Sequence, residues 1–196
     1  SLFWSSYCLY QIDHYEQAVR EIEVQLRTFP KGIWRPEAEY LMGISLLRLQ
    51  KFKEAADLLK NFWIRFPQHP LEESARYAYA WSLVSLGQYE EGRKAFEEVL
   101  LTFPKGNLSD PTFWGILKTY LGTHEVERAT LFYQRFLSHF LSSPWAEKSL
   151  FDIGQYYFER GEYAQATTTF RQFLRVYPES YLQEWAYFML GESLFS

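Results

Sequence analysis

Apolar residues recur along the chain in stripes that have the spacing of an α-helix. Ala18, Ile22 and Leu26 share one helical face, because residues four apart are neighbours on a helix. Between residues 38 and 47 the apolar positions again have helical spacing. Short polar turns separate the stripes at residues 13–14, 50–51, 87–88, 123–124 and 161–162. The pattern predicts pairs of antiparallel helices, each pair joined by a tight turn.

The stripes repeat with a period of 37 residues. An aromatic residue returns at every step of this length: Phe29, Phe66, Phe103, Phe140 and Tyr177. A small residue does the same in the middle of each stripe: Ala18, Ala55, Gly92, Ala129 and Ala166. Self-similarity at a period between about 20 and 50 residues is typical of solenoid architectures. The chain is therefore predicted to consist of stacked copies of one helix pair.

Prolines mark where the predicted helices end and begin. Proline follows the repeated aromatic residue at Pro30, Pro67, Pro104 and Pro178. The second helix of each pair should stop there, because proline cannot continue a helix beyond its first turn. Prolines at residues 36, 70, 111 and 144 stand where the next helix should start. Ser109 and Asp110, ahead of Pro111, are candidates for a helix N-cap.

The spacing of small and large residues resembles the tetratricopeptide repeat. Two copies of its motif are Met42-Gly43, Leu46, Ala55, Leu59 and Pro67, and Ile153-Gly154, Tyr157, Ala166, Phe170 and Pro178. The resemblance covers the whole chain and implies an all-α, right-handed superhelical solenoid of about 11 helices. The period is longer than the usual ~34 residues, and in this the chain is similar to bacterial cell-envelope members of the family, such as outer-membrane assembly lipoproteins and Tol–Pal coordinators.

Some positions depart from the motif of the family. The early tryptophan is replaced by Glu39, Arg76, Phe113 and Leu150. In the fourth repeat, Leu117 stands where glycine is expected and Leu141 where proline is expected. We expect a local irregularity in that repeat.

The repeats predict one solenoid domain over residues 1–196. The copies span about residues 1–35, 36–72, 73–109, 110–146, 147–180 and, in part, 181–196. The last segment is a first helix without a second one, and its outer face is apolar at Trp185, Phe188 and Phe195. Terminal helices of stable solenoids normally have a polar outer face. We therefore expect either self-association through residues 181–196 or a chain that is part of a longer array.

One aromatic column is the candidate binding surface. The column contains Phe3, Tyr40, Tyr77, Trp114, Phe151 and Phe188, and four residues later lie Tyr7, Ile44, Trp81 and Lys118. The resemblance implies that these first-helix positions face a concave groove that binds peptides or partner helices. The candidate groove residues are Phe3, Tyr7, Tyr40, Ile44, Tyr77, Trp81, Trp114, Lys118 and Phe151. The alternative is that these side chains only pack between neighbouring first helices.

Composition narrows the class of function. The chain is 47% hydrophobic and 20% aromatic, which is enough to form packed cores. A net charge of −4 argues against nucleic-acid binding by phosphate neutralisation. No apolar run approaches the ~18 residues that a membrane span needs. The single Cys8, which we expect to be buried, permits neither an internal disulfide nor a cysteine-based zinc site.

The sequence contains little that predicts catalysis. Its four histidines, His14, His69, His124 and His139, lie in or near turns without metal-ligand spacing, and we expect them to be solvated turn residues. Acidic pairs such as Glu72-Glu73 and Glu90-Glu91 are typical of helix starts and solvated faces. We therefore predict no catalytic residues, no metal, no cofactor and no enzymatic activity.

The leading hypothesis is a non-catalytic scaffold that binds a partner protein or peptide in the groove. The resemblance favours a bacterial envelope assembly, at the periplasm or the outer-membrane periphery, and leaves a cytoplasmic location open. Two other classes stay open. One is a glycan-handling module of polysaccharide export or cell-wall assembly, with Tyr40, Tyr77, Trp81 and Trp114 stacking on sugars. The other is an auxiliary superhelical domain of a larger enzyme.

Overall fold

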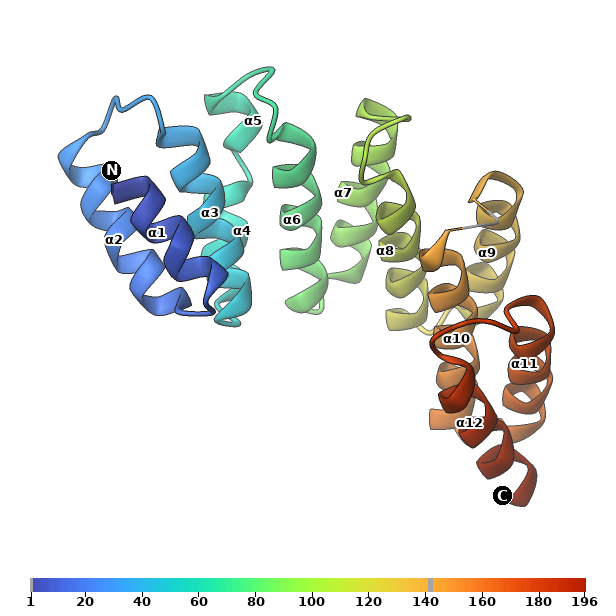
Figure 1. Ribbon diagram of the computed structural model, residues 1–196. Helices are drawn as coiled ribbons and strands as arrows, with labels where there is room; N and C mark the ends of the chain where they lie inside the picture. The colour runs from blue at the N-terminus through green and yellow to red at the C-terminus, as the bar shows by residue number, and fades with distance from the viewer. Residues whose placement is uncertain (1, 141–142) are drawn as a thin grey trace. The chain divides into compact units, whose positions relative to one another are not determined.

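A computed structural model describes residues 2–140 and 143–196, and it leaves the side chains of residues 139 and 140 undescribed. Helices are the regular elements within these ranges, which contain no strand, so the predicted all-α architecture is confirmed. Leu141 and the side chains of His139 and Phe140 lie outside the described part of the chain. The helices form two compact units, residues 1–108 and residues 109–196 (Figure 1). The prediction of a single domain stays a prediction.

Unit 1 contains three helix pairs. Its helices are α1 (Leu2–Gln11), α2 (Tyr15–Thr28), α3 (Arg35–Arg48), α4 (Phe52–Leu59), α5 (Phe62–Arg65), α6 (Glu72–Ser85) and α7 (Tyr89–Thr102). The pairs are α1 with α2, α3 with α4 and α5, and α6 with α7, and each first helix also packs on the second helix of the preceding pair. The predicted helix–turn–helix unit is therefore present in each repeat of unit 1.

Unit 2 contains two further pairs and a single helix. Its helices are α8 (Ser109–Gly122), α9 (Val126–Phe140), α10 (Pro144–Glu159), α11 (Tyr163–Val176) and α12 (Gln183–Phe195). Helix α8 pairs with α9 and α10 pairs with α11, whereas α12 packs on α11 and α10 (Figure 1). The described residues thus form 12 helices instead of about 11, because the second helix of the second repeat is divided into α4 and α5.

A buried carboxylate accompanies the division of that second helix. Glu39 is 2% exposed, and the Nε atom of Arg35 and the Nη2 atom of Arg65 each lie 2.8 Å from one of its oxygens. The Nη2 atom of Arg65 also donates to the backbone carbonyl of Leu58, at 2.7 Å. That carbonyl lies at the end of α4, where helical hydrogen bonding stops, so the guanidinium satisfies an otherwise open acceptor. Two arginines therefore stabilise a carboxylate at a position where the family motif has tryptophan.

The tight turn inside each pair uses one residue in the left-handed backbone region. These residues are Asp13, Gln50, Gly87, His124 and Gly161, with φ between 59° and 76°. In the second repeat the Lys51 amide donates to the Leu46 carbonyl at 2.9 Å and the Gln50 amide donates to the Leu47 carbonyl at 3.1 Å. These two bonds define a Schellman motif, which satisfies the last carbonyls of the first helix. The predicted turn positions are confirmed.

Proline ends the second helices as predicted. The residues before the prolines that follow α2, α5, α7 and α11 leave the helical region, with φ between −125° and −130° and ψ between 63° and 68°. Steric contact with the proline ring disfavours the helical conformation for the preceding residue. Helix α9 has no such proline after it and extends to Phe140, one residue beyond the equivalent end of the other second helices.

The helix starts follow the proline pattern less closely. Pro36 and Pro144 lie in the first turn of α3 and α10, as predicted. Pro70 lies two residues before α6, because Gln68 adopts φ of 60° and the Glu72 amide donates to the His69 carbonyl, which forms an extra turn. That prediction is wrong. The N-cap prediction is also wrong, since α8 already begins at Ser109.

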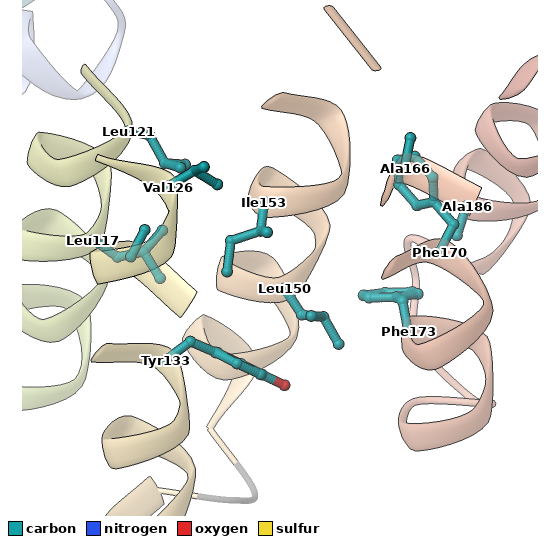
Figure 2. Packing of buried hydrophobic residues seen from close by; sticks show 11 residues of the cluster. Leu117, Leu121, Val126, Tyr133, Leu150, Ile153, Ala166, Phe170, Phe173 and Ala186 are labelled. Atoms are coloured by element: carbon teal, nitrogen blue, oxygen red, sulfur yellow. The ribbon is translucent and has the colours of Figure 1, made fainter. Parts of the chain in front are cut away.

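Large side chains of the second helices pack over small residues of the first helices. A Cβ atom built on Gly43 would lie 2.7 Å from Leu59, and one on Gly154 would lie 2.9 Å from Phe170. Such distances leave no room for a side chain, so glycine is needed for the helices to approach this closely. Figure 2 shows the core of unit 2, where Phe170 and Phe173 come from α11 and the ring of Phe173 points toward Leu150 of α10.

Cys8 and several apolar side chains are exposed. The prediction that Cys8 is buried is wrong, because α1 directs Phe3 and Ser6 toward its neighbours and Cys8 toward solvent. In α12, Trp185 and Phe188 are 62% and 56% exposed. None of the described helices has both the length and the apolar character that crossing a membrane requires.

Replacing Gln50 with glycine should stabilise the protein. Gln50 has φ of 59°, a conformation that costs a residue with a Cβ atom about 1 kcal/mol and glycine little. We expect Gln50→Gly to raise the midpoint of urea unfolding. Gly87→Ala is the matched control of opposite sign, since Gly87 has φ of 76° and should lose stability. Loss of stability in both variants would contradict this account of the turn.

The buried Tyr133, which pairs with the half-buried Tyr177 in unit 2, should make the free energy of unfolding fall at alkaline pH. The hydroxyls of Tyr133 and Tyr177 are 3.0 Å apart, and burial, followed by the hydrogen bond to Tyr177, raises the pKa of Tyr133 above the ordinary 10.0. A tyrosine whose pKa is higher in the folded than in the unfolded state adds to the free energy of unfolding. This contribution is fully present below about pH 10 and is lost as the pH rises above that value.

Tyr133→Phe should therefore reduce the loss of the free energy of unfolding between pH 8 and pH 11, measured with urea. Tyr181→Phe, at a position that is 68% exposed, is the control and should keep the wild-type loss. An unchanged alkaline slope in Tyr133→Phe would rule out this tyrosine as its source.

Candidate functional site

A cavity of about 480 Å³ lies against the first helices of unit 1. We call it the aromatic groove. It is lined by Tyr10, Tyr40, Ile44, Leu47, Arg48, Phe52, Ser74, Tyr77, Ala78, Trp81 and Ser85. These residues come from α1, α3 and α6, with Phe52 from the start of α4. Tyr40, Ile44, Tyr77 and Trp81, four of the predicted groove residues, therefore line a single cavity.

Helical spacing explains why these side chains converge. Tyr40 and Ile44 are four residues apart on α3, and Tyr77 and Trp81 are four apart on α6, so each pair occupies one helix face. Between the two pairs, Ala78 has no side chain beyond its methyl group. The small residue leaves space that the surrounding larger side chains do not fill.

The aromatic residues of α6 pack and line the cavity at the same time. The ring centroids of Tyr77 and Trp81 lie 5.7 Å and 5.3 Å from that of Phe96, which is fully buried in α7. Both side chains are nevertheless half-buried and border the cavity. Tyr77 therefore both packs on a neighbouring helix and lines the aromatic groove.

The polar groups of the groove are mostly hydrogen-bond donors. Burial raises the pKa of Tyr40 and of Tyr77, while hydrogen bonds with Ser74 and Trp81 respectively act in the opposite direction. Both hydroxyls therefore stay protonated at neutral pH. Arg48 is exposed at the cavity, and its hydrogen bond with Tyr10 raises the pKa of the guanidinium. The groove thus combines apolar walls with neutral hydroxyls and one cation.

The repeated columns did not predict several residues that line the aromatic groove, namely Arg48, Phe52, Ser74, Ala78 and Ser85. Arg48 continues the series Tyr40, Ile44 at the next i+4 step, so the helical periodicity contained the signal for it. The serines carry no such signal, because short polar side chains occur on solvated faces as often as in cavities.

The first two predicted residues lie outside this cavity. Phe3 is 7% exposed, and its ring stacks on Trp34 with centroids 5.2 Å apart and planes 3° from parallel. Tyr7 is 40% exposed on α1. Phe3 thus belongs to the packing between α1 and the loop before α3.

In unit 2, Trp114 and Lys118 meet at one carboxylate. The indole Nε1 of Trp114 donates to Asp152 Oδ2 at 2.7 Å, and Lys118 Nζ lies 3.6 Å from the same oxygen. The Trp145 ring lies 4.8 Å from that of Trp114, and Lys148 Nζ lies 5.2 Å from the Trp114 ring centroid. These contacts hold the Trp114 ring in place. Phe151, in contrast, packs on Phe170 and Phe173, with centroids 5.6 Å and 5.8 Å away.

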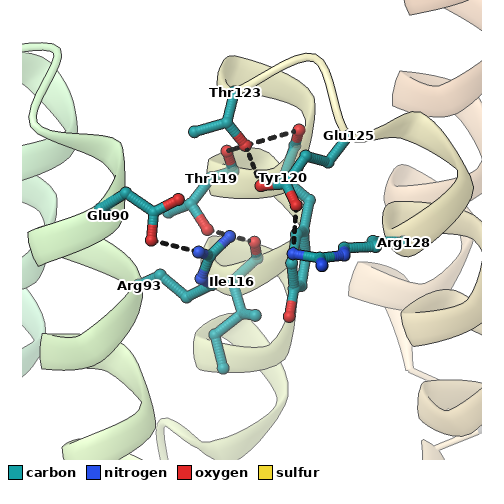
Figure 3. Close-up of polar contacts among 8 residues, drawn as sticks. All are labelled: Glu90, Arg93, Ile116, Thr119, Tyr120, Thr123, Glu125 and Arg128. Atoms are coloured by element: carbon teal, nitrogen blue, oxygen red, sulfur yellow. Dashed lines mark hydrogen bonds and ion pairs between the residues drawn. The ribbon is translucent and has the colours of Figure 1, made fainter.

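A second cavity, of about 590 Å³, lies on α8 and α9 and contains none of the predicted residues. It is lined by Tyr120, Arg128, Leu131, Phe132, Gln134, Arg135 and Ser138. Figure 3 shows the adjacent turn, where the Thr123 hydroxyl bonds the Glu125 carboxylate at 2.7 Å and Arg128 pairs with Glu125. These contacts tie the end of α8 to the start of α9.

The other chemistry-bearing side chains lie apart from one another. In the described part of the chain, no three His, Cys, Asp or Glu residues come together in a way that could hold a metal ion. The predicted solvated state of His69 is wrong. The His69 ring packs on Phe62 at 5.9 Å between centroids, and Nδ1 accepts a hydrogen bond from the Leu71 amide at 3.2 Å.

Two parts of the chain match models of known protein families. Residues 121–196 match the model of the outer membrane lipoprotein family YfiO. Residues 27–99 match the model described as subunit 3 of the anaphase-promoting complex, or cyclosome. No curated protein sequence matches the chain significantly.

Solved structures of tetratricopeptide-repeat proteins resemble the chain over nearly its whole length. The TPR-like repeats of a putative kinesin light chain from Podosopora anserina are 14% identical, with a TM-score of 0.73, over 92% of this chain and 95% of that one. A thermophilic TPR protein of Thermus thermophilus is 16% identical, with a TM-score of 0.64, over 100% and 98%. YrrB, described as a TPR protein with an unusual peptide-binding site, is 13% identical, with a TM-score of 0.63, over 91% and 86%. The similarity lies in the fold.

Removing the indole N–H of Trp114 should destabilise the protein. The Asp152 side chain is 10% exposed, so its carboxylate depends on Trp114 and Lys118 for compensation. We expect Trp114→Phe to lower the free energy of unfolding by about 1–3 kcal/mol in urea titrations. In the background Asp152→Asn, which removes the buried charge, the same substitution should cost clearly less. Equal costs in both backgrounds would contradict the coupling.

Proposed function

Because this chain is a tetratricopeptide-repeat protein, we propose that it is a non-catalytic scaffold that holds a peptide or helix of a partner protein in the aromatic groove. The observation that carries the proposal is the cavity of about 480 Å³ bordered by Tyr40, Ile44, Tyr77 and Trp81. A space of this size accommodates one or two large side chains of a bound segment. Aromatic residues around such a space are typical of the anchor points of protein interfaces.

The chemistry of the groove indicates what kind of segment it accepts. Ile44, Leu47 and the rings of Tyr77 and Trp81 favour an apolar or aromatic anchor. Arg48 favours a carboxylate next to that anchor, and the Tyr40 hydroxyl can donate a hydrogen bond to a backbone carbonyl. The preferred ligand is therefore an apolar peptide or amphipathic helix with an acidic residue at its edge.

The comparisons support a scaffold of this kind in a bacterial envelope assembly. The fold is that of proteins such as YrrB, whose description includes a peptide-binding site. The match of residues 121–196 to an outer membrane lipoprotein family supports the envelope as the place of action. We propose both the peptide partner and the envelope setting for this chain.

A glycan ligand is the second candidate, and one observation favours it. Trp114 and Trp145 lie 4.8 Å apart, with Lys118 and Asp152 beside them, and aromatic faces next to charged groups can stack on sugar rings. This cluster lies in unit 2, on other residues than the aromatic groove. Variants of the two sites therefore separate the two candidates.

Peptides selected from a displayed random library provide the test of the groove. We expect them to share an apolar anchor and an acidic residue, and to bind the protein measurably in fluorescence polarisation. Ile44→Asp should weaken this binding by about ten-fold or more, because it places a charge in the cavity. Ser85→Trp fills the exposed rim of the cavity without removing a core side chain, and should weaken binding as well.

Ile64→Asp is the matched control. Ile64 is 71% exposed on α5 and does not line the groove, so this variant should bind as the wild type does. Circular dichroism shows whether each variant keeps its helices. Binding that survives both Ile44→Asp and Ser85→Trp would refute the groove as the peptide site. The glycan candidate would be favoured by two results together. The peptide library would yield no binding peptide, and cell-wall oligosaccharides would bind the wild type but not a variant that lacks the Trp145 side chain.

A further inference from the structure

A cavity of about 460 Å³ lies at the loop between α2 and α3. The described residues that line it include three cations, Lys31, Arg35 and Arg65, and no acidic residue. Arg35 begins α3, whereas Arg65 comes from the end of α5 in the following repeat. The remaining lining consists of Gly32, Ile33, Phe66 and two prolines. We call this space the basic cavity, and it shares no residue with the aromatic groove.

One buried carboxylate holds both guanidinium groups of the basic cavity. Arg35 Nε and Arg65 Nη2 each lie 2.8 Å from an oxygen of Glu39, whose side chain is 3% exposed. Arg35 Nη1 also donates to the Pro30 carbonyl, and Arg65 Nη2 donates to the Leu58 carbonyl. Among the described residues, Nη2 of Arg35 and both Nε and Nη1 of Arg65 have no hydrogen-bond partner. The two groups are therefore fixed in place and keep donors for a ligand.

The positive charge of the basic cavity exceeds what its surroundings neutralise. Glu39 supplies one negative charge against the three cations, which leaves two positive charges. The neighbouring Glu37 does not line the cavity, and its Oε1 atom lies 3.5 Å from Nε2 of His69. Lys31 is exposed and forms no ion pair with any residue that the structure describes. The basic cavity thus favours a ligand group with two negative charges.

We propose that the basic cavity binds the phosphate monoester group of an organic ligand. Such a group has a charge of about −1.5 to −2 at pH 7, which matches the two uncompensated cations, whereas a carboxylate has only one charge. Guanidinium groups also bond phosphate oxygens in pairs. Ile33, which is 84% exposed, and the ring of Phe66 offer apolar surface to the organic part of the ligand.

The third repeat contains the same loop sequence without the arginines. Phe103-Pro104-Lys105-Gly106 repeats Phe29-Pro30-Lys31-Gly32 two periods later, and Ser109 stands at the position of Arg35. A carboxylate lies against this loop, since Glu73 Oε1 accepts a hydrogen bond from the Leu108 amide at 2.8 Å. Lys105 is exposed like Lys31. It therefore serves as a control with the same residue type in the same loop position.

The experiment titrates the full chain with phenyl phosphate at pH 7.5 and follows the amide signals by NMR spectroscopy. We expect saturable shifts at Gly32, Ile33 and Arg65. Phenyl sulfate, which has a similar shape but one charge, should bind more weakly. At pH 5 this difference should disappear, because the second pKa of a phosphate monoester is about 6. Failure of phenyl phosphate to bind, or equal binding of the two compounds at pH 7.5, would overturn the proposal.

Lys31→Glu should weaken the binding of phenyl phosphate by about five-fold or more, because it reverses an exposed charge at the cavity. The control Lys105→Glu should bind as the wild type does. Salt at about 0.15 M limits the reach of both charges to about 8 Å. Arg65→Lys keeps a cation beside Glu39 but loses the guanidinium donors, and it should also weaken binding. Equal losses in Lys31→Glu and Lys105→Glu would contradict the proposed site.

Vesicles distinguish the two sources of such a phosphate. Phosphatidic acid in phosphatidylcholine vesicles presents a phosphate monoester, whereas phosphatidylglycerol presents a diester. Sedimentation of the protein with the first vesicles alone, lost in Lys31→Glu, would support the site and identify a lipid headgroup. Binding of phenyl phosphate without binding to either vesicle would support the site and identify a soluble ligand. Equal binding to both vesicles that Lys31→Glu leaves unchanged, without phenyl phosphate binding, would overturn it.

Discussion

The pairs α3–α4 and α10–α11 depend on a large side chain of the second helix packing over a glycine of the first. At Gly43 under Leu59 and at Gly154 under Phe170 there is no room for even one methyl group. The close contact brings the two helices together along their length and buries Leu59 and Phe170 completely. Because the pair cannot bury all its apolar surface alone, it stacks on the next pair through the same helices.

The packing of the helices also decides whether an aromatic residue near the repeated glycine or alanine position is buried or borders a cavity. Phe3 and Phe151 lie against other rings inside the helix stack. Tyr77 and Trp81 pack one edge on Phe96 and keep another edge on the aromatic groove, where Ala78 leaves space. Trp114 is different again, because Asp152 accepts its N–H and holds the ring in place. One repeated column therefore contains both residues that only pack and residues that also border a cavity.

The sequence predicted the fold in detail because the repeat supplies the same information several times. Helix pairs, tight turns and the stops before proline are all confirmed. Gly87 and Gly161 are residue types that readily adopt the left-handed conformation of the turn. Gln50 and His124 adopt the same conformation at the same repeat position, although their residue types do not favour it. The errors concern single sites, namely the start of α6 after Pro70, the N-cap before α8, and the burial of Cys8 and His69.

The sequence by itself determined the architecture. The periodic spacing of small residues, apolar residues and prolines depends on where helices run and where they end, so the spacing indicates the local backbone geometry. The tertiary structure decided which members of a column share a cavity and which are covered. Arg48, Ser74 and Ser85 join the aromatic groove because α3 and α6 pack side by side, and Arg65 of α5 reaches Glu39 of α3 to form an ion pair at 2.8 Å. Gly191 and Gly154 occupy equal positions in the sequence, yet a ring fills the space at one and no described atom fills it at the other. Contacts of this kind depend on neighbours that are distant in the chain, and a periodic pattern carries no information about them.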